Sequence, residues 1–271
     1  MLKFRSTMLW MLKSLPNRLT LKRLMAFGSI AFLGTLFVTD PPSVCSAQDS
    51  SVKTTEEPKP LTKYLGRRIA IPMSYHGIPW LNRPERIQEE NPEEMLEQLE
   101  VQPGMTVCDM GCGDGYYTME LAKRVGPTGK VIAVDIQPEM LQELSRRCER
   151  NNLKNVEMIL GLPHDPKLPT GKIDLILMVD VYHEFSNPVE MLTSMRESLK
   201  PNGRIALVEF RGEDPQVPIK PEHKMTKKQI LKEYQANKMG LVKEYDRLPW
   251  QHLMFMGAES QEKSPKQPKP E

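Results

Sequence analysis

The sequence has 271 residues, of which 37 are basic and 35 acidic. Residues 1–47 hold six of the basic residues and one acid, so the rest of the chain carries 31 basic against 34 acidic residues. Because binding to a phosphate backbone requires a basic surface, this slightly acidic balance excludes nucleic acid as a partner. The length predicts one core domain with extensions.

The amino-terminal residues have the layout of a secretory signal peptide. Residues 1–23 are basic, residues 24–38 form an uncharged apolar run of 15, and residues 41–47 are small and turn-forming. A spanning helix needs roughly 20 apolar residues, yet an uncleaved anchor through residues 24–38 remains open. We expect cleavage after Ala47 and export to the periplasm or medium, with membrane contact only through this segment if it is retained. A start at Met25 is the competing possibility.

Three further segments flank the expected core, residues 91–258. Residues 48–60 are polar and Pro-containing, which predicts a disordered linker, and residues 259–271 predict a disordered tail. Residues 61–90 are rich in aromatics but broken by prolines, which favours either a lid or an arm packed on the core.

Within the core, expected strands and helices alternate, which predicts an α/β fold of Rossmann-like, doubly wound type with a mostly parallel sheet. A short connection through Pro249 and Trp250 predicts a terminal antiparallel hairpin. Residues 200–203 predict a turn. The expected strands are 106–110, 130–136, 156–161, 173–179, 204–210, 241–248 and 252–257, and the expected helices begin near 92 and span 116–125, 138–151, 188–199 and 226–238.

Alternating glycines at 111, 113 and 115 follow the first of these strands and precede a helix. Glycine permits positive φ and close approach of the backbone to a ligand, and the amides at a helix start favour carboxylate, phosphate or ribose groups. The pattern is GxGxG, because residue 116 is Tyr where the dehydrogenase fingerprint has Gly or Ala.

Asp135 ends the next strand, 24 positions after Gly111, where a carboxylate can accept hydrogen bonds from both ribose hydroxyls. NAD and S-adenosylmethionine both present that diol. Asp109, two positions before the first glycine, and the lack of a second phosphate-binding pattern favour S-adenosylmethionine. Cys108, Cys112 and Cys148 form no zinc-like CxxC pairs, so we expect buried thiols and no metal.

Three stretches together resemble motifs of class I S-adenosylmethionine-dependent methyltransferases, over about residues 91–257: Asp109–Gly115, Val131–Asp135 and Asp174–His183. The resemblance implies a seven-stranded sheet and S-adenosylmethionine as cofactor. It implies that the three loop glycines hold the methionine part, Asp135 the ribose, Ile136 and Leu162 the adenine, and that Asp180 lies near the sulfonium. Residues 162–172 leave little room for a helix.

The expected catalytic residues are His183 and Tyr117. His183 follows the fourth strand and could deprotonate a hydroxyl or thiol, or else organise its loop. Tyr116 and Tyr117 either wall the donor or pack in the core. Two weaker sets either receive an anionic acceptor or are solvated charges: Trp80, Arg83 and Arg86, and Lys220, His223 and Lys224.

We therefore predict a methyltransferase that acts on a small-molecule acceptor. Two alternatives belong to other classes. One is a binding protein for a nucleotide-like ligand that does not catalyse, and the other is a nicotinamide-dependent oxidoreductase.

Overall fold

A computed structural model describes residues 56–258. The predicted signal peptide or anchor, most of the predicted linker and the predicted tail therefore lie outside the described residues. Within the described range, no helix is both long enough and apolar enough to cross a membrane.

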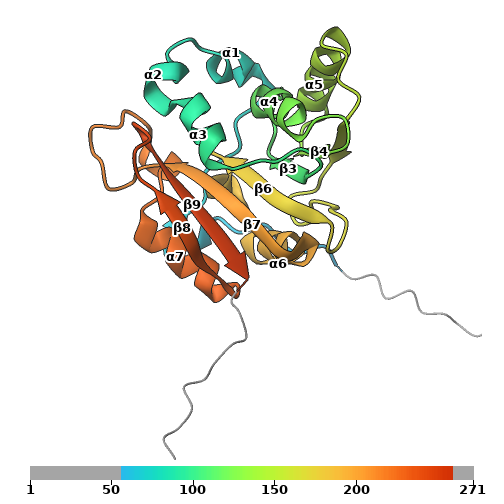
Figure 1. The fold of residues 1–271 in the computed structure, drawn as a ribbon. Helices are drawn as coiled ribbons and strands as arrows, with labels where there is room; N and C mark the ends of the chain where they lie inside the picture. Colours follow the sequence, from blue (N-terminus) through green and yellow to red (C-terminus); the bar gives the residue numbers. More distant parts are fainter. Residues whose placement is uncertain (1–55, 259–271) are drawn as a thin grey trace, which may run out of the picture. The chain divides into compact units, whose positions relative to one another are not determined.

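The core is a seven-stranded sheet in the order β5-β4-β3-β6-β7-β9-β8 (Figure 1). The first five strands in this order pair in parallel, and β9 pairs antiparallel with both β7 and β8. The predicted fold class is confirmed, including the terminal hairpin. The strands are β3 (Thr106–Met110), β4 (Lys130–Asp135), β5 (Val156–Leu160), β6 (Ile173–Val179), β7 (Leu199–Phe210), β8 (Met239–Tyr245) and β9 (Gln251–Ala258).

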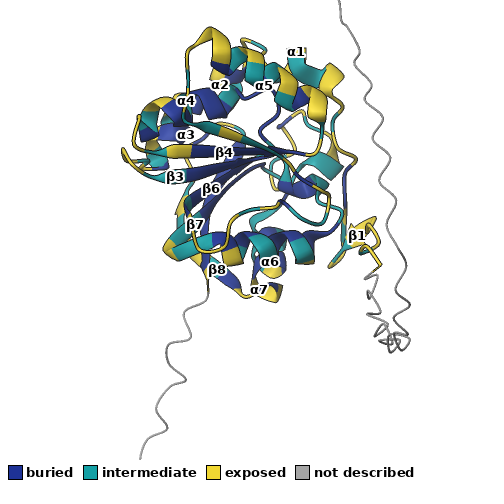
Figure 2. Ribbon diagram, turned by 90° about the vertical axis from the view of Figure 1, so that its right-hand side faces the viewer, coloured by how far each residue is buried: buried dark blue, intermediate teal, exposed yellow. Residues whose placement is uncertain are grey.

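Helices cover both faces of the sheet, whose strands are buried between them (Figure 2). Side chains alternate between the faces along each strand. In β6, for example, Ile176 packs with α6 and α7, whereas Leu177 packs with α3 and α4. The five longest helices are α3 (Pro92–Gln98), α4 (Tyr116–Val125), α5 (Pro138–Arg150), α6 (Pro188–Ser198) and α7 (Lys227–Ala236).

Helix starts follow the sequence signals. Proline, whose missing N–H costs nothing at a first helical position, opens α3, α5 and α6. Thr226 caps α7 by accepting a hydrogen bond from the backbone N–H of Gln229. The predicted turn at residues 200–203 is wrong, because these residues belong to β7 and a register shift against β6 accommodates them. Residues 162–172 form no helix, as the shortness of this stretch predicted.

The segment before α3 crosses the carboxyl edge of the sheet. It contains the hairpin β1 (Lys63–Tyr64) and β2 (Arg67–Arg68), a 3-10 turn at Tyr75–Gly77, and the short helices α1 (Ile78–Leu81) and α2 (Arg86–Glu90). The backbone N–H of Ala70 and the Arg67 guanidinium both donate to the carbonyl of His183, at 3.1 and 2.8 Å. These bonds fix the segment against the loop that follows β6.

Candidate functional site

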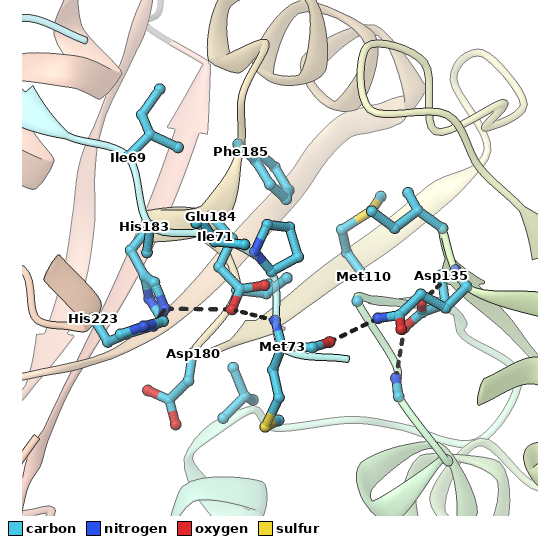
Figure 3. Close-up of a pocket in the computed structure, with 18 of the residues that line it drawn as sticks. Ile69, Ile71, Met73, Met110, Asp135, Asp180, His183, Glu184, Phe185 and His223 are labelled. Atoms are coloured by element: carbon cyan, nitrogen blue, oxygen red, sulfur yellow. Dashed lines mark hydrogen bonds and ion pairs between the residues drawn. The ribbon is translucent and has the colours of Figure 1, made fainter. Parts of the chain in front are cut away.

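A cavity of about 780 Å³ lies at the carboxyl ends of β3, β4 and β6, under the segment 61–90. Open α/β sheets bind ligands at this edge, where the strand order reverses, and here the reversal falls between β3 and β6. Figure 3 shows two separate polar groups in the wall, with Met73 between them. We call the part around Asp135, Gly111 and Gly113 the aspartate end, and the part around His183, Glu184 and His223 the histidine end.

The glycine loop forms part of the aspartate end, and all three glycines have positive φ, of 69°, 55° and 89°. A Cβ at Gly111 would lie 2.4 Å from Val181, and one at Gly113 would lie 3.2 Å from Leu81. Both glycines line the cavity. Gly115 has a different reason to be glycine, because a Cβ there would lie 2.3 Å from Leu144 of α5.

Asp135 is positioned by the backbone of the loops around it. Its Oδ2 accepts from the N–H of Gly113 at 2.9 Å, and its Oδ1 accepts from the N–H of Gln137 at 2.8 Å. Burial raises the pKa of Asp135, and these backbone hydrogen bonds act in the opposite direction. Each carboxylate oxygen has a second lone pair, so Asp135 can still accept two hydroxyls. Ile136 and Leu162 line the same cavity and supply partly exposed apolar surface.

Asp109 lies behind the glycine loop. It is 3% exposed and its Oδ2 accepts from the Thr118 hydroxyl at 2.5 Å, at the start of α4. Burial raises the pKa of Asp109 to about 6, although the hydrogen bond from Thr118 lowers it. Asp109 was expected to bind the ligand, but among residues 56–258 it is not part of the cavity wall. Its position indicates support for the loop and for α4.

Asp180 follows β6 with φ of 52° and lines the cavity. Its Oδ2 accepts from Gln251 Nε2 at 2.7 Å, whereas its buried Oδ1 has no hydrogen-bond partner within the described part of the chain. Burial raises the pKa of Asp180, and the nearby carboxylates of Glu90 and Glu209 raise it further. A buried oxygen without a partner is costly, so this atom is suited to accept a hydrogen bond from a ligand.

His183 is the centre of the histidine end and is only 2% exposed. Its Nδ1 lies 2.6 Å from Glu209 Oε2, and its backbone N–H donates to Glu209 Oε1 at 3.1 Å. Burial lowers the pKa of His183, but attraction to Glu209 and the hydrogen bond to it outweigh burial, so the pKa is raised. Because Glu209 occupies Nδ1, the other ring nitrogen, Nε2, faces the rest of the histidine end.

Glu184 and His223 complete the histidine end. Nε2 of His183 lies 3.0 Å from His223 Nδ1 and 3.9 Å from Glu184 Oε1. Glu184 Oε1 also accepts from the N–H of Met73 at 3.2 Å, which ties this end to the covering segment (Figure 3). Burial raises the pKa of Glu184 to about 7, while His183 opposes the rise. Burial and the neighbouring His183 lower the pKa of His223.

Tyr117, the second expected catalytic residue, packs in the core with Leu121 and Val125. Its hydroxyl has no hydrogen-bond partner among the described residues, and the Arg86 guanidinium lies 5.0 Å from its ring centre. Tyr117 is not among the described residues that line the cavity. Its position therefore indicates packing, which was the other interpretation of this tyrosine.

The two weaker sets divide. Trp80, Arg83 and Arg86 all line the cavity, but both arginines pair with Glu90, so neither is a free cation. His223 and Lys220 also line it. Lys224 instead donates to the backbone carbonyls of residues 214 and 217.

Two functional side chains escaped the sequence analysis. Glu209 is a fully buried acid that holds His183, and Gln251 holds Asp180. An acid inside the apolar run Leu207–Phe210 was a usable signal for the first, because buried charges are rare unless paired. No comparable signal marked Gln251, whose partner lies 71 residues away.

The cysteines at 108, 112 and 148 are buried free thiols, as expected. Cys108 lies in β3 and Cys148 in α5, on opposite faces of the sheet.

Comparison with known proteins adds sequence relatives. A family model described as a methyltransferase domain matches residues 101–261. Ribosomal protein L11 methyltransferase from Burkholderia mallei is 42% identical over 115 residues, which are 42% of this chain and 34% of that protein. An uncharacterized 37.1 kDa protein in a Streptomyces fradiae transposon is 38% identical over 115 residues, 42% of this chain and 33% of that protein. The matched part thus spans about a third of the length of these curated relatives.

Solved structures agree with these relatives. A SAM-dependent methyltransferase from Aquifex aeolicus superposes with a TM-score of 0.64 at 26% identity, over 68% of this chain and 98% of that chain. The PH0226 protein from Pyrococcus horikoshii superposes with a TM-score of 0.56 at 17% identity, over 69% of this chain and 100% of that chain. The second similarity shows the fold alone.

Proposed function

The chain belongs to the methyltransferase domain family and is an S-adenosylmethionine-dependent methyltransferase, and from this premise we propose that its acceptor is a small molecule with a hydroxyl or thiol group. The observation that carries the proposal is one cavity with two different polar ends. The aspartate end suits a nucleoside, and the histidine end suits a group that loses a proton.

The residues of the aspartate end fit S-adenosylmethionine. We assign the ribose hydroxyls to Asp135, the adenine to the apolar surface of Ile136 and Leu162, and the methionine part to the backbone at Gly111 and Gly113. A side chain at either glycine would project into this space or into its wall. Oδ1 of Asp180, which has no partner within residues 56–258, can accept a hydrogen bond from the donor's ammonium group.

At the histidine end we place the nucleophilic atom of the acceptor, beside Nε2 of His183. Bound S-adenosylmethionine supplies a methyl group on positively charged sulfur. The protein then has to align the acceptor with that methyl and to favour loss of the acceptor's proton. Glu209 fixes the ring of His183, and Glu184 and His223 supply further polar atoms at the same point.

A protein acceptor is the second candidate, because the name of the Burkholderia relative specifies ribosomal protein L11. The covering segment favours the small molecule. The backbone N–H of Met73 donates a hydrogen bond to Glu184 over the histidine end, and His183 is almost completely buried. A side chain of a folded protein would have to pass this cover to reach Nε2.

The test combines a binding and a transfer experiment. Calorimetry with S-adenosylhomocysteine should show one site per chain, and NAD should show none. Labelled S-adenosylmethionine, offered with a panel of small alcohols, phenols and thiols and separately with ribosomal protein, should label the small molecules. Label only in the protein would overturn the acceptor proposal, while absence of S-adenosylhomocysteine binding would overturn the donor site.

We also propose that the domain acts outside the cytoplasm. The support is sequence alone: every basic residue before Asp40 lies on the amino side of the apolar run, which favours export of the chain beyond that run. Cell fractionation with sequencing of the mature amino terminus tests this. A terminus at Gln48 in the extracytoplasmic fraction is expected, and an intact basic segment in the soluble cytoplasmic fraction would contradict it.

A further inference from the structure

We propose that His183, Glu184 and His223 bind a divalent transition-metal ion at the histidine end of the cavity. One potential ligand atom from each residue lies within 4.8 Å of the other two. His183 Nε2 is 3.0 Å from His223 Nδ1 and 3.9 Å from Glu184 Oε1. In a tetrahedral zinc site with bonds of about 2.0–2.1 Å, the ligand atoms are ~3.3 Å apart. The first distance would therefore lengthen by about 0.3 Å and the second would shorten by about 0.6 Å. The third pair, His223 and Glu184, would close from a separation of at most 4.8 Å.

A second observation concerns the buried carboxylate behind His183. Metal-binding histidines commonly donate their other ring N–H to a carboxylate, which fixes the tautomer and orients the ring. Glu209 is 0% exposed and meets Nδ1 of His183 at 2.6 Å, while it also accepts the backbone N–H of the same residue. With the proton held on Nδ1, the lone pair of Nε2 points at His223 and Glu184, where a cation would lie.

The ligand set restricts the kind of metal. Mg²⁺ and Ca²⁺ prefer oxygen ligands throughout, and Cu⁺ prefers sulfur. Two imidazoles and one carboxylate suit Zn²⁺ and its neighbours Fe²⁺, Co²⁺ and Mn²⁺. Cys108, Cys112 and Cys148 are not part of the cluster, so none of the thiols within residues 56–258 is among its ligands.

The coordination is incomplete on the side of the cavity. Three protein ligands with an open fourth position are typical of catalytic zinc sites, whereas structural sites use four. All three residues line the cavity, so the open position faces it. This last step rests on the proposed function: an acceptor hydroxyl or thiol at that position would lose its proton more readily, and the proton would pass to water in the open cavity. His183 then acts as a ligand and not as the base.

The test uses the untagged full-length chain, stripped with a chelator and dialysed against Zn²⁺ without donor or acceptor. We expect about one ion per chain by elemental analysis. His223→Ala and Glu184→Gln should each weaken Zn²⁺ binding at least tenfold, and Glu209→Gln should weaken it ~10–100-fold through His183. His76→Ala is the matched control, since this histidine is exposed and outside the cluster, and it should bind as the unaltered chain does.

A chain that takes up no Zn²⁺, or variants of residues 184 and 223 that bind it unchanged, would overturn the proposal. Thermal melts show whether each variant is folded. Co²⁺ in the unaltered chain gives a readout without variants: visible d–d absorption is expected, and thiolate-to-cobalt charge transfer would place the ion on cysteines and refute the site. Because these measurements omit S-adenosylmethionine, they succeed or fail separately from the calorimetry that tests the donor site.

Discussion

The aspartate end of the cavity comes from one short stretch of chain, residues 111–136, together with Leu162, whereas the histidine end joins residues that are far apart in sequence. His183 follows β6, Glu209 lies in β7 and His223 in a 3-10 turn, and the covering segment precedes them all. The first end is a strand–turn–helix motif whose geometry is local. The second exists only once β6 and β7 pair and their carboxyl ends meet.

This difference separates the functions that the two ends can carry. The aspartate end presents backbone amides and a carboxylate that is itself held by backbone amides, an arrangement suited to hydrogen bonding with hydroxyl groups. The histidine end has three titratable groups within hydrogen-bonding or ion-pairing distance, with pKa values moved in both directions. Perturbed groups of this kind concentrate at catalytic sites. We therefore expect substitutions to separate donor binding from turnover.

The largest expected effect is that of His183→Ala on turnover. Loss of the group beside the reacting atom should lower kcat by about 100-fold or more, once an acceptor is in hand. The affinity for S-adenosylhomocysteine should change less than threefold, because His183 lies at the other end of the cavity (Figure 3). Steady-state kinetics and calorimetry on the same preparation measure both.

His183→Ala needs a control for correct folding, because the His183 ring is buried. The backbone carbonyl of His183 also accepts a hydrogen bond from Arg67 of the covering segment. A circular dichroism melt identifies a variant that has unfolded, and His183→Gln keeps much of the side-chain volume. Turnover within a few-fold of the unaltered enzyme in a folded variant would mean that alignment alone drives the transfer.

The second prediction concerns Asp135→Ala, which should weaken S-adenosylhomocysteine binding more than tenfold. Loss of charge-assisted hydrogen bonds to the ribose costs about 1.5–3 kcal/mol. At saturating donor, kcat should fall by much less. Since Asp135 also accepts the N–H of Gly113, Asp135→Asn serves as the control that keeps an acceptor there. Unchanged affinity in a folded Ala variant would remove the ribose assignment.

The sequence predicted the fold well because its signals are local. β3, α4 and β6 begin and end where periodicity and glycines place them, and the resemblance implied the remaining topology. The same holds for Gly111, Gly113 and Asp135 in the cavity wall. The prediction of Tyr117 as a catalytic residue failed for a physical reason. Tyr117, Leu121 and Val125 are spaced four apart along α4, which puts Tyr117 on the inner face of that helix.

The histidine end could be predicted only in part. His183 was identified as a candidate, and His223 belonged to one of the weaker sets. Their association with Glu209 and with each other depends on contacts between distant elements. Parallel neighbours bring their carboxyl ends together, so an acid in the strand after His183 could have been proposed as its partner. The metal-type cluster has one ligand pair adjacent in sequence and the third 39 positions later, which matches no short spacing motif.

The third prediction concerns Asp109, which lies behind the glycine loop and supports the aspartate end. Asp109 has its pKa raised by burial to about 6, so its carboxyl favours the folded state when protonated. That contribution is complete below the unfolded pKa of about 4 and is lost as pH rises to about 6. Asp109→Asn removes this loss. Relative to the unaltered chain it should gain free energy of unfolding across that range.

The difference between the unfolded pKa of about 4 and the folded pKa of about 6 limits this gain to ~3 kcal/mol. The amide nitrogen that Asp109→Asn introduces cannot accept hydrogen bonds as a carboxylate oxygen does, which offsets part of the gain and leaves about 1 kcal/mol. Denaturant unfolding at pH about 4 and about 7 measures the difference. Thr118→Val, which removes the hydroxyl that Asp109 accepts from, is the matched variant and should shift stability in the opposite direction at neutral pH. A difference between Asp109→Asn and the unaltered chain that does not vary with pH would contradict the assignment.

The smallest expected effect belongs to the covering segment, through Trp80→Ala. Trp80 is 48% exposed and lines the cavity, and the Arg83 guanidinium lies 3.7 Å from its ring centre. An exposed contact of this type holds the covering segment in place with about 0.5–1 kcal/mol, so its loss should lower ligand affinity by at most two- to fivefold, with the fold intact. Trp80→Phe keeps a ring under Arg83 and should recover most of the affinity. Because the segment bonds directly to Glu184 at the histidine end, the loss should be greater for the acceptor than for S-adenosylhomocysteine. An equal loss for both ligands would show that residues 61–90 cover the two ends of the cavity alike. The difference between the two ends would then be confined to the residues at the carboxyl ends of the strands.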